Sequence, residues 1–259
     1  MTMELPAART APKVVGMPKK GLMLAVGHPK SGKTWFAASA PKSLVIELEE
    51  GGADRVPGGR ILEVSCTANT VAEAKAAIER FDEAMTLAMQ SDDVEIVTID
   101  SVDQLARMHI VELGLANKPA AGFDSRTAWG EFASRMHTIT DAMKTCGKLV
   151  ILIAHCKPPE KDNEGRVITP AGINVAGKGA AYICAQAEMI GFIGVRVLAG
   201  KAQHYIRFKS DSDLAIWRSR VDELHEKEIV LDKSDPWGSF AAAFGPAKAA
   251  ETKKEAKKK

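Results

Sequence analysis

The chain has 259 residues, of which 46% are hydrophobic and 26% are charged, so it can build one α/β core with appendages. It contains no apolar run of about 18 residues and no charged-then-apolar N-terminus, so we expect a cytoplasmic protein with no membrane partner. The four cysteines form no C-x-x-C pair, which favours reduced thiols over disulfides or a zinc site.

The net charge of +2 is unevenly distributed along the chain, because residues 247–259 hold six lysines and two glutamates. This Ala/Lys/Glu segment has no apolar periodicity, which is typical of a disordered end. We therefore expect three parts: a flexible N-terminal arm (1–20), a folded core (21–240) and a disordered Lys-rich tail (241–259).

Apolar runs separated by polar joints predict, in chain order, a mainly parallel sheet with helices on both faces. Strands are expected at 22–26, 43–48, 94–99 and 148–153, and further strands near 188–197 and 203–209. Helices are expected at 70–88, 102–113 and 128–144. Residues 6–20 and 157–179 are expected to be irregular.

A phosphate-binding motif, G-x-x-x-x-G-K-T, follows the first predicted strand and precedes a helix-compatible segment. Backbone N–H groups of such a turn converge on an anion, and the first turn of the helix adds partial positive charge. We expect Lys33 to reach the β- and γ-phosphates and Thr34 to bind Mg²⁺. The nucleotide-binding residues are then Gly27, His28, Pro29, Lys30, Ser31, Gly32, Lys33 and Thr34.

A second signature is the apolar strand that ends in Asp100. In phosphate-loop enzymes this position holds the carboxylate that orients Mg²⁺, so Asp100 and Thr34 are the expected metal residues. The next residue is Ser101, whereas ATPases of the AAA type usually place their water-activating glutamate there. A general base must therefore come from elsewhere.

Two other strand ends supply candidates for catalysis. Glu47, Glu49 and Glu50 lie at the end of the second strand, and since parallel strand ends converge on the nucleotide, Glu49 is the expected base. His155 leaves the apolar strand at 148–153, and it would face the γ-phosphate if this strand lies beside the phosphate-loop strand. The alternatives are that the acids cap an exposed strand end and that His155 is a structural polar group.

Together, Gly27 to Thr34, Ile46-Glu47-Leu48-Glu49, Ile99-Asp100-Ser101 and Ile153-Ala154-His155 resemble the RecA-like ATPase core. Weaker local patterns look like bacteriophage nucleotide-binding proteins, including the short single-strand annealing proteins of the Sak type. These patterns are Ser39-Ala40-Pro41-Lys42, Glu49 to Gly52, Ala128-Trp129-Gly130, His155-Cys156-Lys157 and a polar hairpin at 162–167. The resemblance covers about residues 20–220 and implies ATP and Mg²⁺ as cofactors, in the bacterial host cytoplasm if the chain is phage-encoded.

The resemblance also implies DNA contacts and a residue that acts between subunits. Loops that face single-stranded DNA in the RecA-like core would carry Lys118, Phe123, Arg126, Lys157, Lys161, Arg166 and Lys178 here, although ordinary solvated loops are the alternative. A cation from a neighbouring subunit would complete the site, and the candidates are Arg207, Lys209, Arg218 and Arg220.

The favoured function is an ATP-hydrolysing protein that binds single-stranded DNA, assembles as a homo-oligomeric filament or ring, and acts in recombination or strand annealing. A single-strand binding protein is a further candidate partner. One alternative is a small-molecule kinase or stand-alone NTPase switch, although no compact arginine-rich lid is visible. Another is a nucleotide-gated adaptor that recruits replication proteins through its Lys-rich tail.

Overall fold

The computed structural model describes residues 16–49, 59–64, 68–116, 123–210 and 215–245. The central sheet has a continuous strand order that places the phosphate-loop strand in its middle. In that order the strands are β12 (Glu228–Leu231), β10 (Lys201–Arg207), β9 (Met189–Leu198), β1 (Gly21–Gly27), β5 (Leu149–Lys157), β4 (Ile96–Asp100), β2 (Ser43–Glu47) and β3 (Arg60–Glu63). The expectations for the N-terminal arm up to residue 15, for the tail from residue 246 and for Lys118 lie outside the described residues.

The sheet is parallel from β9 through β1, β5, β4 and β2 to β3, and it becomes antiparallel from β9 through β10 to β12. β5 lies between β1 and β4, so one strand separates the phosphate loop from Asp100. Gly27 is in register with His155, and Asp100 with Ile153, which brings three functional strand ends to one edge. This is the predicted mainly parallel, RecA-like α/β fold.

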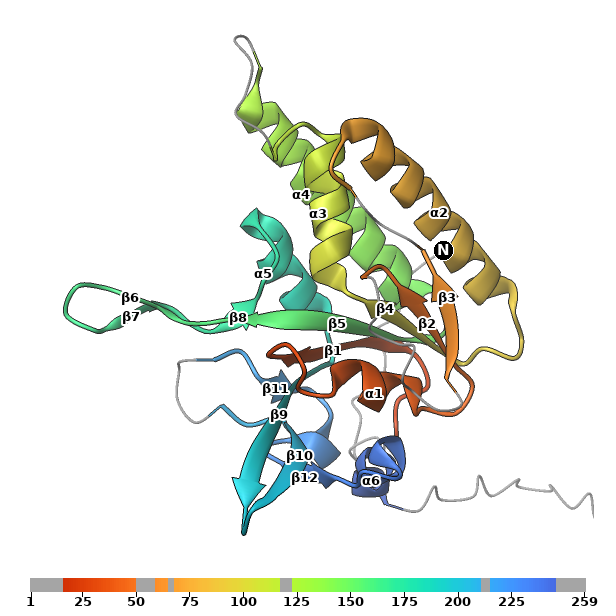
Figure 1. The fold of residues 1–259 in the computed structure, drawn as a ribbon, viewed down its shortest axis with the longest axis vertical. Helices are drawn as coiled ribbons and strands as arrows, with labels where there is room; N and C mark the ends of the chain where they lie inside the picture. Colours follow the sequence, from red (N-terminus) through yellow and green to blue (C-terminus); the bar gives the residue numbers. More distant parts are fainter. Residues whose placement is uncertain (1–15, 50–58, 65–67, 117–122, 211–214, 246–259) are drawn as a thin grey trace, which may run out of the picture.

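Helices cover both faces of the sheet (Figure 1). The helices are α1 (Lys33–Ala38), α2 (Val71–Gln90), α3 (Val102–Glu112), α4 (Ser125–Thr145), α5 (Gly177–Gln186) and α6 (Pro236–Ala241). Successive residues of β1 point to opposite faces: Leu22 and Leu24 join the core under α2, α3 and α4, whereas Met23 joins the core with α1 and α6. Burial on both sides explains why β1 is apolar throughout.

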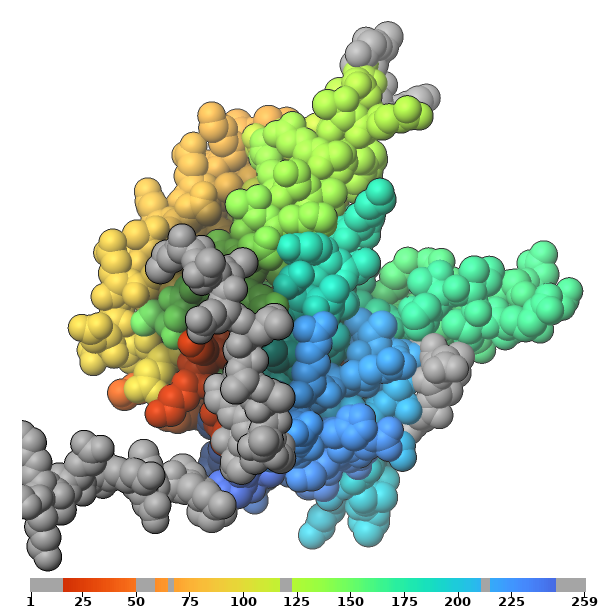
Figure 2. All heavy atoms as spheres, turned by 180° about the vertical axis from the view of Figure 1, so that it is seen from behind, coloured from red at the N-terminus to blue at the C-terminus, as the bar shows by residue number. Residues whose placement is uncertain are grey.

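Several elements escaped the sequence analysis. The predicted irregular segment 157–179 contains the end of β5, the hairpin of β6 (Glu160–Lys161) and β7 (Val167–Thr169), the short strand β8 (Gly172–Ile173) and the start of α5. The segment 157–171, here called the arm, stands out from the body in Figures 1 and 2. Its polar hairpin turn was noticed in the sequence, but α5 was missed because glycines at its first and third positions obscure a helical pattern.

One buried histidine predicts how acid affects the stability of the fold. His109 on α3 is only 4% exposed, and neither ring nitrogen has a hydrogen-bond partner among the described residues. Burial lowers the pKa of His109 from 6.5 to about 4, and the neighbouring Arg135 acts in the same direction. The unfolded chain therefore binds a proton at His109 more readily than the folded chain does between these two values.

We expect the contribution of His109 to the free energy of unfolding to be constant above about pH 6.5. As the pH falls from there toward 4, this contribution should destabilise the fold progressively. Between pH 7.5 and 5.0 this contribution amounts to about 2 kcal/mol. Urea unfolding at both pH values should show that His109→Leu loses less free energy of unfolding on acidification than wild type by this amount. His225→Leu, at an exposed site, should behave as wild type, and equal acid sensitivity of the wild type and His109→Leu would contradict the prediction.

Candidate active site

The phosphate loop connects β1 to α1, and its backbone takes the conformations that the motif requires. Gly32 caps α1 in the left-handed region at φ 95°, and Lys30 also has a positive φ of 64°. A side chain on Gly27 would place its Cβ 2.4 Å from the carbonyl oxygen of Ile193, so the loop can approach β9 only with glycine there. The sequence thus folds the loop tightly against the strand beside it.

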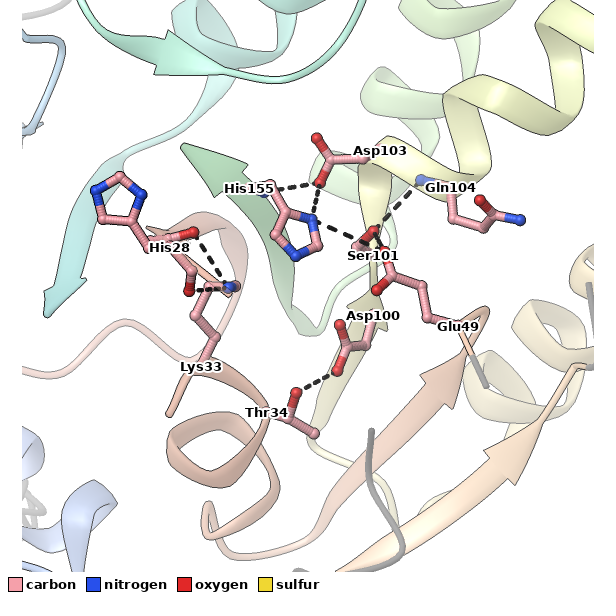
Figure 3. Close-up of polar contacts among 10 residues, drawn as sticks. His28, Lys33, Thr34, Glu49, Asp100, Ser101, Asp103, Gln104 and His155 are labelled. Carbon is pink, nitrogen blue, oxygen red and sulfur yellow. Dashed lines mark hydrogen bonds and ion pairs between the residues drawn. The ribbon is translucent and has the colours of Figure 1, made fainter. Parts of the chain in front are cut away.

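Lys33 is almost completely buried, and its ammonium group turns back over the loop (Figure 3). Its Nζ donates to the carbonyl oxygens of Gly27 at 3.2 Å and His28 at 2.9 Å. Burial lowers the pKa of Lys33, and the charges of Asp100, Asp103 and Glu49 oppose that shift. The amino group is therefore held at the mouth of the loop, where phosphate oxygens would replace the carbonyl contacts.

Thr34 and Asp100 meet directly, although 66 positions separate them in the chain. The Thr34 hydroxyl donates to Asp100 Oδ2 at 2.5 Å. Burial raises the pKa of Asp100 to about 6, and the hydrogen bond from Thr34 acts in the opposite direction. A hydroxyl and a carboxylate oxygen are hard ligands, so this pair fits the Mg²⁺ that the sequence predicts.

Glu49 lies beyond the end of β2, where its side chain turns toward β4 and β5 (Figure 3). Its Oε1 accepts a hydrogen bond from the Ser101 hydroxyl and lies 3.9 Å from His155 Nδ1. The side chain is 40% exposed, which leaves it accessible to water. Of the other two carboxylates considered for this role, Glu47 is only 4% exposed and Glu50 lies outside the described residues.

His155 lies at the end of β5, beside the phosphate-loop strand as its predicted role requires. Its backbone N–H donates to Asp103 Oδ2 at 2.7 Å, and its ring Nδ1 lies 3.3 Å from the same oxygen. Asp103 was missed by the sequence analysis. The detectable signal was its place in the first turn of the helix that follows the strand ending in Asp100, where its side chain can reach the next strand end.

The basic residues considered for action between subunits lie in different surroundings. The guanidinium carbon of Arg207 lies 5.1 Å from the centre of the Phe192 ring. Burial raises the pKa of the Cys156 thiol, and the charges of Lys33 and Arg207 oppose this rise. Lys209, Arg218 and Arg220 are all exposed, and Arg220 donates to the carbonyl oxygen of Ala185. Arg207 is therefore near the phosphate loop of its own chain, and action in a neighbouring site remains a prediction.

The predicted DNA-binding residues do not form one patch of unpaired charge. Lys157 pairs with Glu160, while Arg166 pairs with both Asp162 and Glu164. Residues 157–171 contain three basic and three acidic side chains, so the arm carries no net charge. The remaining candidates in the described chain are all exposed: Phe123 just before α4, Arg126 on α4, Lys161 on the arm and Lys178 on α5.

Comparison with protein families decides the classification. The sequence profile described as AAA domain matches residues 19–215, which is most of the chain. The chain belongs to this family. Comparison with curated proteins gives no match. Among solved structures, a KaiC-like protein from the hyperthermophilic archaeon Pyrococcus horikoshii OT3 is similar, with 14% identity, a TM-score of 0.42, and coverage of 82% of this chain and 85% of that chain.

In this AAA domain Ser101 follows Asp100, the predicted metal residue, and the structure shows how a carboxylate still reaches that place. The Ser101 hydroxyl donates to Glu49, which comes from the neighbouring strand end. Ser101 also caps α3, because its Oγ accepts from the backbone N–H of Gln104. The residue after Asp100 is not a glutamate, but the side chain of Glu49 therefore lies beside it.

A cavity of about 500 Å³ adjoins Glu49 and His155 in the AAA domain. Its walls come from α3, the end of β5 and the segment before α5, and its polar lining includes Asp103, Arg107 and Asn174. A second cavity, of about 530 Å³, lies beside Lys148 and Trp237 at the opposite ends of the parallel strands, away from the phosphate loop. Within the described residues, no helix is both long and apolar enough to span a bilayer.

Proposed function

We propose that the chain binds ATP with Mg²⁺ and hydrolyses it at the edge formed by the phosphate loop, β2, β4 and β5. The observation that carries this proposal is the direct Thr34–Asp100 contact beside the buried Lys33, with Glu49 and His155 on the two flanking strand ends. Each group that phosphoryl transfer to water needs is thus supplied by one chain, apart from a further cation.

The chemistry follows from the position of each side chain. Lys33 neutralises charge that builds on the phosphate oxygens, and Thr34 and Asp100 would hold Mg²⁺, which would supply further positive charge there. Glu49 accepts the proton of the attacking water, and the new bond from the water oxygen to the γ-phosphorus replaces the bond to the β-phosphate oxygen. His155 lies beside the same space at the end of β5, where its side chain would contact the γ-phosphate and so respond to its presence or loss.

The proposed partners are single-stranded DNA and further copies of this chain, with a role in recombination or strand annealing. The exposed cations Arg126, Lys161 and Lys178 support this proposal, since sequence-independent strand binding depends on backbone contacts. The ion pairs within the arm limit its contribution to DNA binding. We therefore expect weak DNA binding that falls steeply as salt is added.

Steady-state ATP hydrolysis with and without a single-stranded oligonucleotide tests this partner. We expect turnover to rise severalfold with DNA and the rise to shrink in Arg126→Ala/Lys178→Ala, because these exposed cations would contact phosphates. A matched control is Lys75→Ala, which removes an exposed lysine on α2. Turnover that ignores DNA, together with no protection of a labelled oligonucleotide, would exclude the DNA-dependent role.

The cavity beside Glu49 favours a second candidate, phosphoryl transfer to a small hydroxyl-bearing acceptor. Arg107 and Lys157 line this cavity and could hold an anionic acceptor next to the carboxylate that removes its proton. Incubation with γ-labelled ATP and a panel of nucleosides and sugars distinguishes the two candidates. Label in an organic product, rather than only in inorganic phosphate, would support the kinase.

A further inference from the structure

A single carboxylate oxygen holds His155 at two points. Asp103 Oδ2 lies 2.7 Å from the backbone nitrogen of His155 and 3.3 Å from its ring Nδ1. The carbonyl oxygen of His155 also accepts the backbone N–H of Asn174 at 3.0 Å, just before α5. The end of β5 is therefore fastened to α3 on one side and to the approach of α5 on the other.

The environment of Asp103 is unusual for a residue in the first turn of a helix. A carboxylate there is commonly exposed, where it stabilises the helix dipole. The Asp103 side chain is instead only 10% exposed, and its other oxygen, Oδ1, is buried with no hydrogen-bond partner among the described residues. Burying a carboxylate costs free energy unless it is hydrogen-bonded, so the bonds to His155 are what offset this cost.

The contact between Asp103 and the ring of His155 also determines which ring nitrogen carries the proton. With Nδ1–H donated to Asp103, the neutral ring has its lone pair on Nε2. That second nitrogen points toward the space between Lys33 and Asp100, where the phosphates and attacking water are expected (Figure 3). Among the described residues, the carboxylates of Asp103 from α3 and Glu49 from the end of β2 face this ring, and the charge of Lys33 from α1 acts on both.

We propose that Asp103 is the positioning residue of this site: it fixes the orientation and the Nδ1–H tautomer of His155, so that Nε2 faces the γ-phosphate and its water. This inference rests on the proposed ATP hydrolysis. Asp103 touches neither nucleotide nor water in this role, and it acts through His155 alone. Its loss should therefore slow turnover without weakening nucleotide binding.

The test is a double-mutant cycle of Asp103→Ala and His155→Ala, with kcat and the dissociation constant for ATP measured separately. We expect Asp103→Ala to lower kcat about 10- to 100-fold, as loss of an orienting carboxylate typically does, while nucleotide affinity is unchanged. In the His155→Ala background the same substitution should have no further effect. Asp103→Asn should lower kcat less than Asp103→Ala does, because its one amide oxygen can accept both bonds.

Nitrogen NMR of the His155 ring gives a readout that a purely structural role would not move. Wild type and Asp103→Asn should show the proton on Nδ1, whereas Asp103→Ala should shift the population toward Nε2–H. An equal drop in kcat from Asp103→Ala with and without His155, or an unchanged tautomer, would overturn the inference.

The cycle also separates this inference from the proposed function. If His155→Ala hydrolyses ATP at the wild-type rate while Lys33→Ala is inactive, the role of Asp103 is refuted and hydrolysis at this site stands. If Lys33→Ala remains active, the proposed function itself fails.

Discussion

Lys33→Ala should abolish ATP hydrolysis while leaving the fold intact. The Lys33 ammonium is held over the loop by the carbonyl oxygens of Gly27 and His28, and no other cation of the loop is buried. Removing one preorganised charge from the transition state costs about 3–4 kcal/mol, or roughly 10²–10³-fold in kcat. Release of inorganic phosphate is the measurement, with thermal unfolding as the check on folding.

The control for this variant is Lys75→Ala, which removes an exposed lysine from α2 and should leave turnover unchanged. Burial lowers the pKa of Lys33, which means that its charged form is costly to bury. Because alanine at position 33 removes this cost, we expect no loss of stability. Phosphate release by Lys33→Ala at the wild-type rate would show that hydrolysis occurs elsewhere or belongs to a contaminant.

Glu49→Gln should retain nucleotide binding and lose most of the turnover. Glutamine keeps the shape of the side chain and can accept the hydrogen bond from Ser101, but it cannot take a proton from water. Loss of a general base typically lowers the rate about 10²–10⁴-fold. Equilibrium binding of a labelled nucleotide and steady-state hydrolysis, measured on the same preparation, separate these two effects.

Glu63→Gln provides the matched control, because Glu63 is an exposed carboxylate at the end of β3, the strand next to β2. This variant should hydrolyse ATP as wild type does. If Glu49→Gln also kept the wild-type rate, the base would have to be another group, and the RecA-like interpretation of the strand end would be wrong.

Much of the parallel sheet could be predicted from the sequence, because a strand buried on both faces reads as an uninterrupted apolar run. The runs at Leu22 and Ile96 are examples, and the strands form there. The antiparallel partner β12 was missed because it alternates exposed and buried residues over only four positions. Short edge strands offer too few residues for a period to show.

The site was predictable to the extent that it follows from strand ends. Glu49, Asp100 and His155 each close an apolar run, and parallel topology brings such positions together. Asp103 could not be found in this way, because its contact depends on how a helix turn packs against a strand from another part of the chain. The ion pairs of Arg166 likewise depend on the geometry of the hairpin rather than on the charges alone.

The central place of β1 has a consequence for how the chemical state of the nucleotide can be transmitted. All seven residues of this strand are buried, and it is hydrogen-bonded to β5 on one side and β9 on the other. A displacement of the phosphate loop would disrupt the hydrogen bonds of β1 to both neighbouring strands, so we expect the loop to stay in place. If the proposed hydrolysis drives a movement, we expect it to begin at the strand ends, and the arm that continues from β5 begins two residues beyond His155.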